Sequence, residues 1–262
     1  MVGKLLLRGM LVGVLAGILS FAFLKVVGEP QVDRAIAFET QMDEAKSKAA
    51  AEDARGKGMS MPAEAPEEEI VSRSVQAGLG LFTGVTVYNM AFGGLFSLVF
   101  ALVYGRIGPF GPRTTAAMVA AMGFVAVYLV PNLKYPANPP SVGEPATIGM
   151  RTGLYFGMIL ISLIAMIAAN KLRGLLLNRV GGWNATLTAG AFYLFGVVVA
   201  CLLLPGINEV PEGFPAVVLW QFRVASFGAQ LIMWTTIGLC FGAWAEGILA
   251  REAPRVGAAI RA

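Results

Sequence analysis

The sequence predicts an all-α, polytopic integral membrane protein with about six transmembrane helices and both termini in the cytoplasm. Its 262 residues are 56% hydrophobic and only 14% charged, and their mean hydropathy is +0.69. Soluble domains carry about 25% charged residues. Several apolar stretches approach the roughly 20 residues that a helix needs to cross a hydrocarbon core of about 30 Å. The composition therefore excludes an ordinary water-soluble globule.

The apolar stretches give the predicted spans. The first follows basic residues, as a signal peptide would, but its apolar run is longer than usual and no convincing cleavage site follows, so we expect it to be retained. A five-span alternative, in which the short third stretch fails to cross and the C-terminus lies outside, stays open. The predicted spans cover residues 5–27, 79–103, 115–133, 152–169, 185–204 and 227–249.

The basic residues of the short connections predict the orientation, because positive charges near span ends resist translocation. The two short outer loops then hold only three, Lys134, Arg151 and Arg223, while the long first loop is left out because long loops largely escape the rule. The cytoplasmic side holds ten, which are Lys4, Arg8, Arg106, Arg113, Lys171, Arg173, Arg179, Arg251, Arg255 and Arg261.

One long connection differs sharply from the rest in composition. Residues 28–78 hold eleven acidic and six basic residues, a net charge of 6 − 11 = −5. A solvated amphipathic helix is expected from Asp33 to Arg55, and a linker from Gly56 to Pro66. The chain is thus predicted to divide into a first transmembrane helix (1–27), an acidic extracytoplasmic loop (28–78), a five-helix transmembrane domain with two outer motif loops (79–250) and a cytoplasmic tail (251–262).

The first outer motif is PNLKYPANPPSVGEP, residues 131–145, in which five of fifteen residues are proline. Proline stiffens the backbone and removes amide donors, so this loop is suited to holding a shape. Its oxygens could serve a hard or borderline cation in an outer vestibule. A rigid connector with anchoring side chains is the alternative. The candidate substrate-pathway residues here are Asn132, Lys134, Tyr135, Asn138 and Glu144.

The second motif is WQFRVASFGAQ, residues 220–230, where polar side chains enter the membrane from the same side. An ionisable residue at such depth is a functional hypothesis by default, and we expect Arg223 to pair with Glu144, Glu209 or Glu212. Alternatively, Arg223 snorkels to the lipid headgroups. The further candidates for the substrate pathway are Arg151, Trp220, Gln221, Arg223 and Gln230.

Glycines at intervals of four predict faces where helices approach closely. Asn89 is the best candidate for a buried hydrogen-bonding residue among the spans. The glycine sets are Gly9, Gly13 and Gly17; Gly80 and Gly84; and Gly149, Gly153 and Gly157.

Several chemistries are excluded by what the sequence lacks. It has no histidine, so no imidazole metal site or catalytic histidine exists. Cys201 and Cys240 lie at different depths and are not expected to share a metal. There is no phosphate-binding motif, and the net charge of +4 includes no basic run for nucleic acid. We expect neither enzymatic activity nor a cofactor, and no metal ligands are assigned.

The strings PNLKYPANPP, VGEP and WQFRVASFGAQ, with the residues through Phe241 and Gly242, resemble the CbtA family of predicted cobalt transporter subunits. The resemblance implies a multi-pass protein of the bacterial cytoplasmic (inner) membrane that takes up cobalt. It also implies a small one-span CbtB-like partner that carries histidines. Relatives often have histidines in the first outer loop, where this chain has Met59 and Met61.

The leading hypothesis is a transport subunit that passes a divalent cation, cobalt, inward from an outer vestibule formed by the two motifs. Its expected partners are the lipid bilayer, the divalent cation and the one-span subunit, and not nucleic acid. The alternatives are a non-transporting accessory or assembly subunit, and a transporter of another cation or a small organic solute. A membrane enzyme would need convergent titratable groups, which are few.

Overall fold

The structure is a computed structural model that describes residues 2–56, 71–140 and 142–259, with side chains as far as residue 250. All regular elements in these ranges are helical, and no strand occurs among them. They are α1 (Val2–Phe23), η1 (Leu24–Gly28), α2 (Glu29–Gly56), α3 (Arg73–Val75), η2 (Gln76–Gly80), α4 (Leu81–Val103), α5 (Pro112–Gly123), η3 (Phe124–Leu129), α6 (Val130–Lys134), η4 (Pro145–Thr147), α7 (Ile148–Leu203), α8 (Ala216–Thr236), η5 (Ile237–Phe241) and α9 (Gly242–Ala259).

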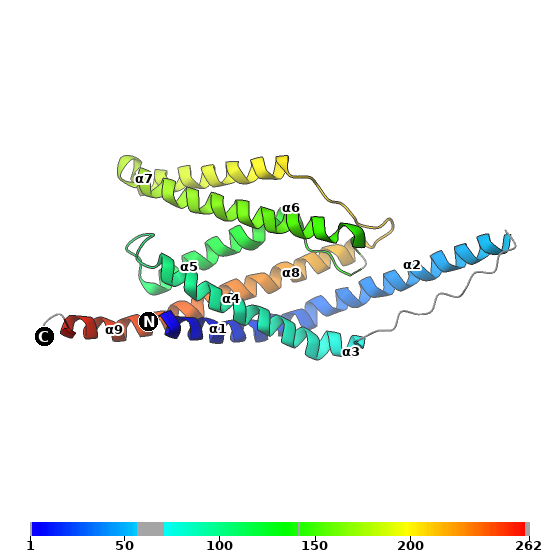
Figure 1. Ribbon diagram of the computed structural model, residues 1–262, viewed down its shortest axis with the longest axis horizontal. Coiled ribbons are helices and arrows are strands. Elements are labelled where there is room, and N and C mark those ends of the chain that lie inside the picture. Colours follow the sequence, from blue (N-terminus) through cyan, green and yellow to red (C-terminus); the bar gives the residue numbers. More distant parts are fainter. Residues whose placement is uncertain (1, 57–70, 141, 260–262) are drawn as a thin grey trace.

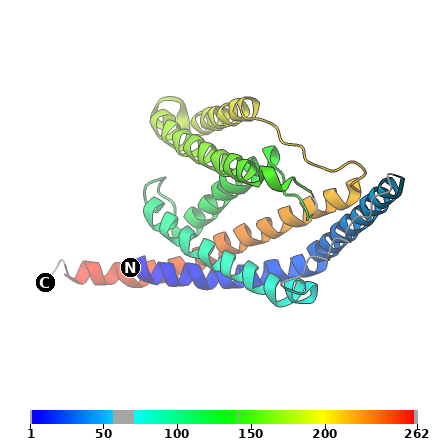
Figure 2. The same cartoon turned by 45° about the vertical axis from the view of Figure 1, so that its right-hand side comes forward.

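Adjacent elements run together into five helices that are long and apolar enough to cross a membrane. The fourth is interrupted at Gly181, where φ is 78° and ψ is 162°. A glycine adopts this backbone without a Cβ clash, and the two arms of α7 fold back beside each other (Figures 1 and 2). The all-α membrane fold is confirmed, with the number six approximate. The five helices are Val2–Gly56, Arg73–Val103, Pro112–Lys134, Pro145–Leu203 and Ala216–Ala250.

The ends of these helices alternate between two sides of the molecule. Both termini lie at the same end as the α4–α5 connection and the turn at Gly181 (Figure 1). The loops 135–147 and 204–215 lie at the opposite end, as does the tip of α2. A topology with both termini on one side of the membrane requires this alternation. The third stretch is helical from Pro112 to Lys134, which argues against the five-span alternative.

The first helix continues past residue 27, where the sequence analysis placed the end of the first span. α1, η1 and α2 form one continuous helix from Val2 to Gly56, which includes the helix expected from Asp33 to Arg55. The π-helical turn η1 ends two residues before Pro30, whose ring is incompatible with the regular hydrogen-bond ladder. Apart from Gly56, the predicted linker lies outside the described residues, and α9 carries helix into the predicted tail.

Glycines of the first span bring α1 and α4 into close contact, as predicted. A Cβ at Gly9 would lie 2.7 Å from Ser97 Cβ, and one at Gly13 would lie 2.7 Å from Met90 Cα. For the other two glycine sets, the prediction of a close helix contact is wrong within the described chain. A Cβ at Gly84, Gly149, Gly153 or Gly157 would meet no described atom within 4 Å, and one at Gly80 would meet only the preceding Val75.

Two large apolar cores divide the described helices, and a third, smaller cluster joins α2 and α8 to the outer loops. The larger, with Phe100 and Phe241 at its centre, joins α1, α4 and α5 to α8, η5 and α9. The second surrounds Met158 and joins the two arms of α7 to α6. Ser162 and Tyr193 are hydrogen-bonded across these arms, with their oxygens 2.8 Å apart. The loop 204–215 connects the second unit to α8 of the first.

Candidate functional site

The two outer motifs are joined through Arg223, which lies in α8. Its Nη2 donates a hydrogen bond to Asn138 Oδ1 at 2.9 Å, and its Nε donates to Ala137 O at 3.2 Å. These acceptors are neutral, so the expected pairing of Arg223 with an acid of the outer loops is wrong. Both oxygens lie in the first proline-rich loop. Arg223 therefore acts as a fixed bridge between the motifs.

A second connection joins the start of α7 to the loop that follows it. Arg151 Nε forms an ion pair with Glu209 Oε2 at 3.2 Å, and Arg151 Nη2 donates to Glu144 O at 3.2 Å. Glu209 also accepts hydrogen bonds from Thr147 Oγ1 at 2.6 Å and from the Glu144 N–H at 2.8 Å. The pKa of Glu209 is lowered mainly by the Thr147 bond, then by the Glu144 amide and the charge of Arg151. Glu144 thus contributes its backbone to this connection.

The remaining residues of the first motif are anchored to the end of α7. Lys134 Nζ donates to Cys201 O at 2.8 Å, and the Tyr135 hydroxyl donates to Pro205 O at 2.9 Å. Asn132 Oδ1 accepts the Ala137 N–H at 3.2 Å, within its own loop. Because helix C-termini carry partial negative charge, the ammonium of Lys134 is favourably placed there. The three side chains hold the loop in one conformation.

The second motif separates into three environments. Trp220 is 68% exposed, away from these hydrogen bonds. Gln221 Oε1 accepts a hydrogen bond from Arg34 Nη1 of α2 at 3.0 Å. Gln230 lies further along α8 and lines two cavities. The structure thus gathers the first motif, Arg151 and Arg223 at the loops, and places Gln230 below them.

The first cavity lies directly beneath the proline-rich loop and has a volume of about 420 Å³. The loop contributes Tyr135, Pro136 and Ala137, and α6 contributes Asn132. The two cores border it, because its walls come from α4, η3, α7 and α8. Tyr155 of α7 is another wall residue. The proline-rich loop therefore forms one end of this cavity, which is partly open to the outside through exposed wall residues such as Phe156.

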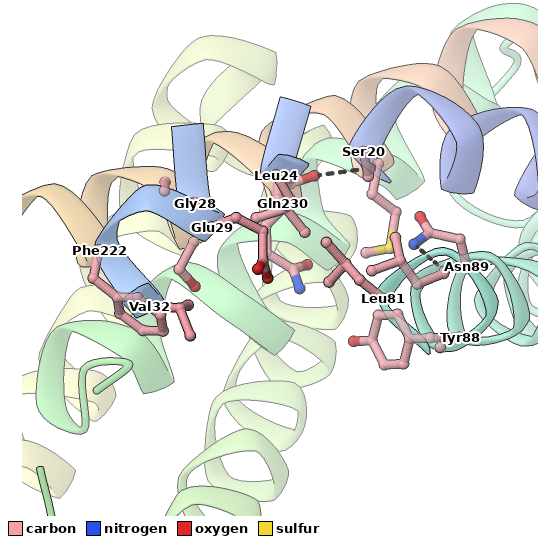
Figure 3. Close-up of a pocket in the computed structure, with 16 residues that line it drawn as sticks. Ser20, Leu24, Gly28, Glu29, Val32, Leu81, Tyr88, Asn89, Phe222 and Gln230 are labelled. Atoms are coloured by element: carbon pink, nitrogen blue, oxygen red, sulfur yellow. Dashed lines mark hydrogen bonds between the residues drawn. The ribbon is translucent and has the colours of Figure 1, made fainter. Parts of the chain in front are cut away.

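The second cavity, also of about 420 Å³, lies between the first helix, α4 and α8 (Figure 3). It shares Tyr88, Ser226 and Gln230 with the first cavity. Its other polar lining includes Glu29 and Asn89. Sequence reasoning singled out Asn89, which is only 3% exposed, but missed Glu29. The only local signal at Glu29 was an acidic residue between a glycine and a proline, which is typical of a loop.

The described residues contain no group of three or more His, Cys, Asp or Glu side chains placed to hold a metal. Cys201 and Cys240 are free thiols that pack against different cores. A cation in these cavities would therefore meet side-chain amide, hydroxyl and carboxylate oxygens. Such oxygens suit hard and borderline divalent cations, which readily accept oxygen ligands.

Comparison with known proteins gives one informative match. The family model described as "Probable cobalt transporter subunit (CbtA)" matches residues 2–246. No curated protein matches the chain, and no solved structure matches it. The matched region includes both motifs and both cavities, and it ends within the second turn of α9. The chain belongs to the CbtA family of probable cobalt transporter subunits.

Proposed function

We propose that this chain is the permeation subunit of a transporter that takes up cobalt(II), which enters between the two motif loops. Family membership supports cobalt transport, and one structural observation supports this route. The two cavities share three lining residues, and together they extend from the proline-rich loop to Asn89. A hydrated cation entering beneath the loop would thus have polar side chains along its way into the helices.

Each of the three basic residues at the proposed entrance is held by a partner within the protein, and Arg151 is the one paired with an acid. Arg151 is neutralised by Glu209, while Arg223 and Lys134 are held by neutral oxygens of the protein backbone and of Asn138. Acidic residues of the segment 28–78 would raise the local cation concentration through their net negative charge. The side chains of Arg151, Arg223 and Lys134 then hold the loops in position.

The proposal places the chain in the bacterial cytoplasmic membrane with both termini inside. It also gives the chain a partner, because the family consists of subunits. A small one-span CbtB-like protein would supply the histidines that this chain lacks. Transport by such a complex requires no catalytic residue in this chain, in keeping with the expectation that it is not an enzyme.

Total cell metals measured by mass spectrometry test the proposal. A host deficient in cobalt uptake expresses the chain, alone and with a one-span histidine-bearing partner. Cobalt is expected to accumulate, and Arg223→Ala is expected to reduce it at equal protein abundance. Arg179→Ala, at the exposed turn on the opposite side, is the matched control and should leave accumulation unchanged.

Two results would contradict this function. Accumulation of a different metal in place of cobalt would support transport but reject cobalt as the substrate. No rise in any metal, from a correctly inserted chain with its partner present, would reject permeation and favour an accessory subunit. In the second case Arg223→Ala would reduce recovery of the partner in a pull-down instead.

A further inference from the structure

Glu29 is an unusual acid for its surroundings. It belongs to the first turn of α2 and lines the second cavity, where its side chain is only 10% exposed. Asp33, one turn further along the same helix, is 62% exposed. A carboxylate removed from water in a largely apolar space is costly unless a positive charge accompanies it. The structure must therefore supply a cation beside Glu29.

Arg73 of α3 is that cation, and it is shared between two acids. Its Nη2 lies 2.6 Å from Glu29 Oε2 and 2.8 Å from Asp33 Oδ1. Its Nε donates a second hydrogen bond to Asp33 Oδ1 at 3.1 Å. If another cation bound Glu29 in place of Arg73, Arg73 would keep its ion pair with Asp33. The arrangement therefore allows Glu29 to exchange Arg73 for another cation while Arg73 keeps a carboxylate partner.

Neutral oxygens from two other helices share the cavity with Glu29. Figure 3 shows Gln230 of α8 and Tyr88 of α4 among the residues that line it, with Asn89 further toward Ser20. Asn89 Nδ2 donates to Val85 O at 2.8 Å. Its Oδ1 is buried, and no hydrogen-bond partner for it is found in the described chain. A buried acceptor without a partner is unfavourable and unusual, so it marks a place where a ligand would be stabilised.

We propose that the second cavity is a binding site for a divalent cation, with the Glu29 carboxylate as its anionic ligand and Arg73 as the competing internal cation. Gln230 and Tyr88, which line the same cavity, supply neutral oxygens, and Asn89 Oδ1 is a further acceptor. When the cation binds, Arg73 remains on Asp33. When the cation leaves, Arg73 again neutralises Glu29. The choice of cobalt(II) as the cation rests on the proposed function, whereas the site rests on these residues.

A purely structural ion pair is the rival explanation, and the two differ in the sign of one effect. If Arg73 and Glu29 only hold α3 against α2, removing either one changes cation binding in the same direction or not at all. If Arg73 competes with the cation, Arg73→Gln strengthens binding while Glu29→Gln weakens it. Asp33→Asn should also weaken binding, because Arg73 is then held by Glu29 alone.

The experiment is a calorimetric titration of the purified full chain in detergent micelles with cobalt(II) chloride. We expect Glu29→Gln to bind at least about tenfold more weakly, since ligand charge sets cation affinity. Arg73→Gln should bind several-fold more tightly. Glu44→Gln is the matched control, because Glu44 is an exposed acid on the same helix that pairs with Lys48 at 3.7 Å, and its binding should equal the wild type.

Wild-type affinity in Glu29→Gln, or weaker binding in a folded Arg73→Gln variant, would overturn the site. If Glu29→Gln fails to fold, Asp33→Asn decides, and unchanged binding in it would overturn the exchange with Arg73. Failure of the site is distinguishable from failure of the proposed function. Cobalt accumulation in cells without binding at Glu29 rejects this inference alone, whereas Glu29-dependent binding without accumulation rejects the transport role alone.

Discussion

Arg223 Nη2 donates a hydrogen bond to Asn138 Oδ1 at 2.9 Å and so joins α8 to the proline-rich loop, across 85 residues of the chain. The same guanidinium also holds the Ala137 carbonyl. Because Ala137 lines the first cavity, this bridge fixes the wall of the proposed entrance.

Replacing Arg223 should therefore loosen the entrance. Arg223→Ala is expected to lower the free energy of unfolding by about 1.5–3 kcal/mol, the usual range for hydrogen bonds to a charged group. Arg223→Lys should retain only part of this stability. Lysine keeps the positive charge, but its ammonium cannot contact both acceptors in the same fixed geometry. Thermal unfolding in micelles measures both. Trp220→Phe is the control at the exposed neighbouring surface, and equal stability of Arg223→Ala and wild type would contradict the bridge.

The Glu209 connection should depend on pH. The pKa of Glu209 lies below its ordinary value of 4.5, so its ionised form is favoured in the folded state. The resulting stability is present above the ordinary value and is lost as pH falls through the lowered pKa. The unfolding temperature of wild type should exceed that of Glu209→Gln at neutral pH, and the gap should close in acid. A gap that stays constant down to pH values well below 4.5 would contradict this assignment.

Close contact of α1 and α4 predicts a sharp difference between glycines. Gly13→Val would place side-chain atoms against the α4 backbone, and overpacking of this kind costs about 1–3 kcal/mol or more. Gly153→Val, at a position with no described atom near a new Cβ, should change stability little. The unfolding temperatures of the two variants give the comparison, and equal losses would contradict the packing described here.

The residues shared by both cavities predict a blockage. Gln230→Trp adds volume where the cavities meet and should reduce cobalt accumulation without loss of protein. Gln230→Asn, which keeps an amide and adds no volume, should retain more accumulation. Gln221→Trp near the outer surface is the control for adding the same ring. Normal accumulation in a correctly inserted Gln230→Trp variant would show that the route does not pass Gln230.

Hydropathy was sufficient for the fold class, because a helix must satisfy its own backbone in lipid and needs a long apolar segment to do so. The sequence could not show where helices continue past the apolar stretch. α2 continues from the first span through a polar segment of good helix formers. Residues 170–184 were likewise expected to be a connection, but the helix persists to the turn at Gly181.

The candidate site was predictable in its location and less so in its contacts. The two motifs do meet, but Arg223 binds a carbonyl and an amide, and any residue can offer a carbonyl. Glu29 was missed because its partner Arg73 lies 44 residues away, across a long connection. Identical glycine spacing at Gly9 and Gly149 led to different outcomes, since spacing does not specify whether a second helix lies opposite.

Cobalt uptake by the purified chain in liposomes tests the central claim most directly. The chain is reconstituted with its one-span partner around a dye that cobalt(II) quenches, and external cobalt is then added. The account predicts quenching faster than in protein-free liposomes, slowed by Arg223→Ala and unaffected by Arg179→Ala. Quenching no faster than in protein-free liposomes, with both proteins correctly inserted, would contradict it.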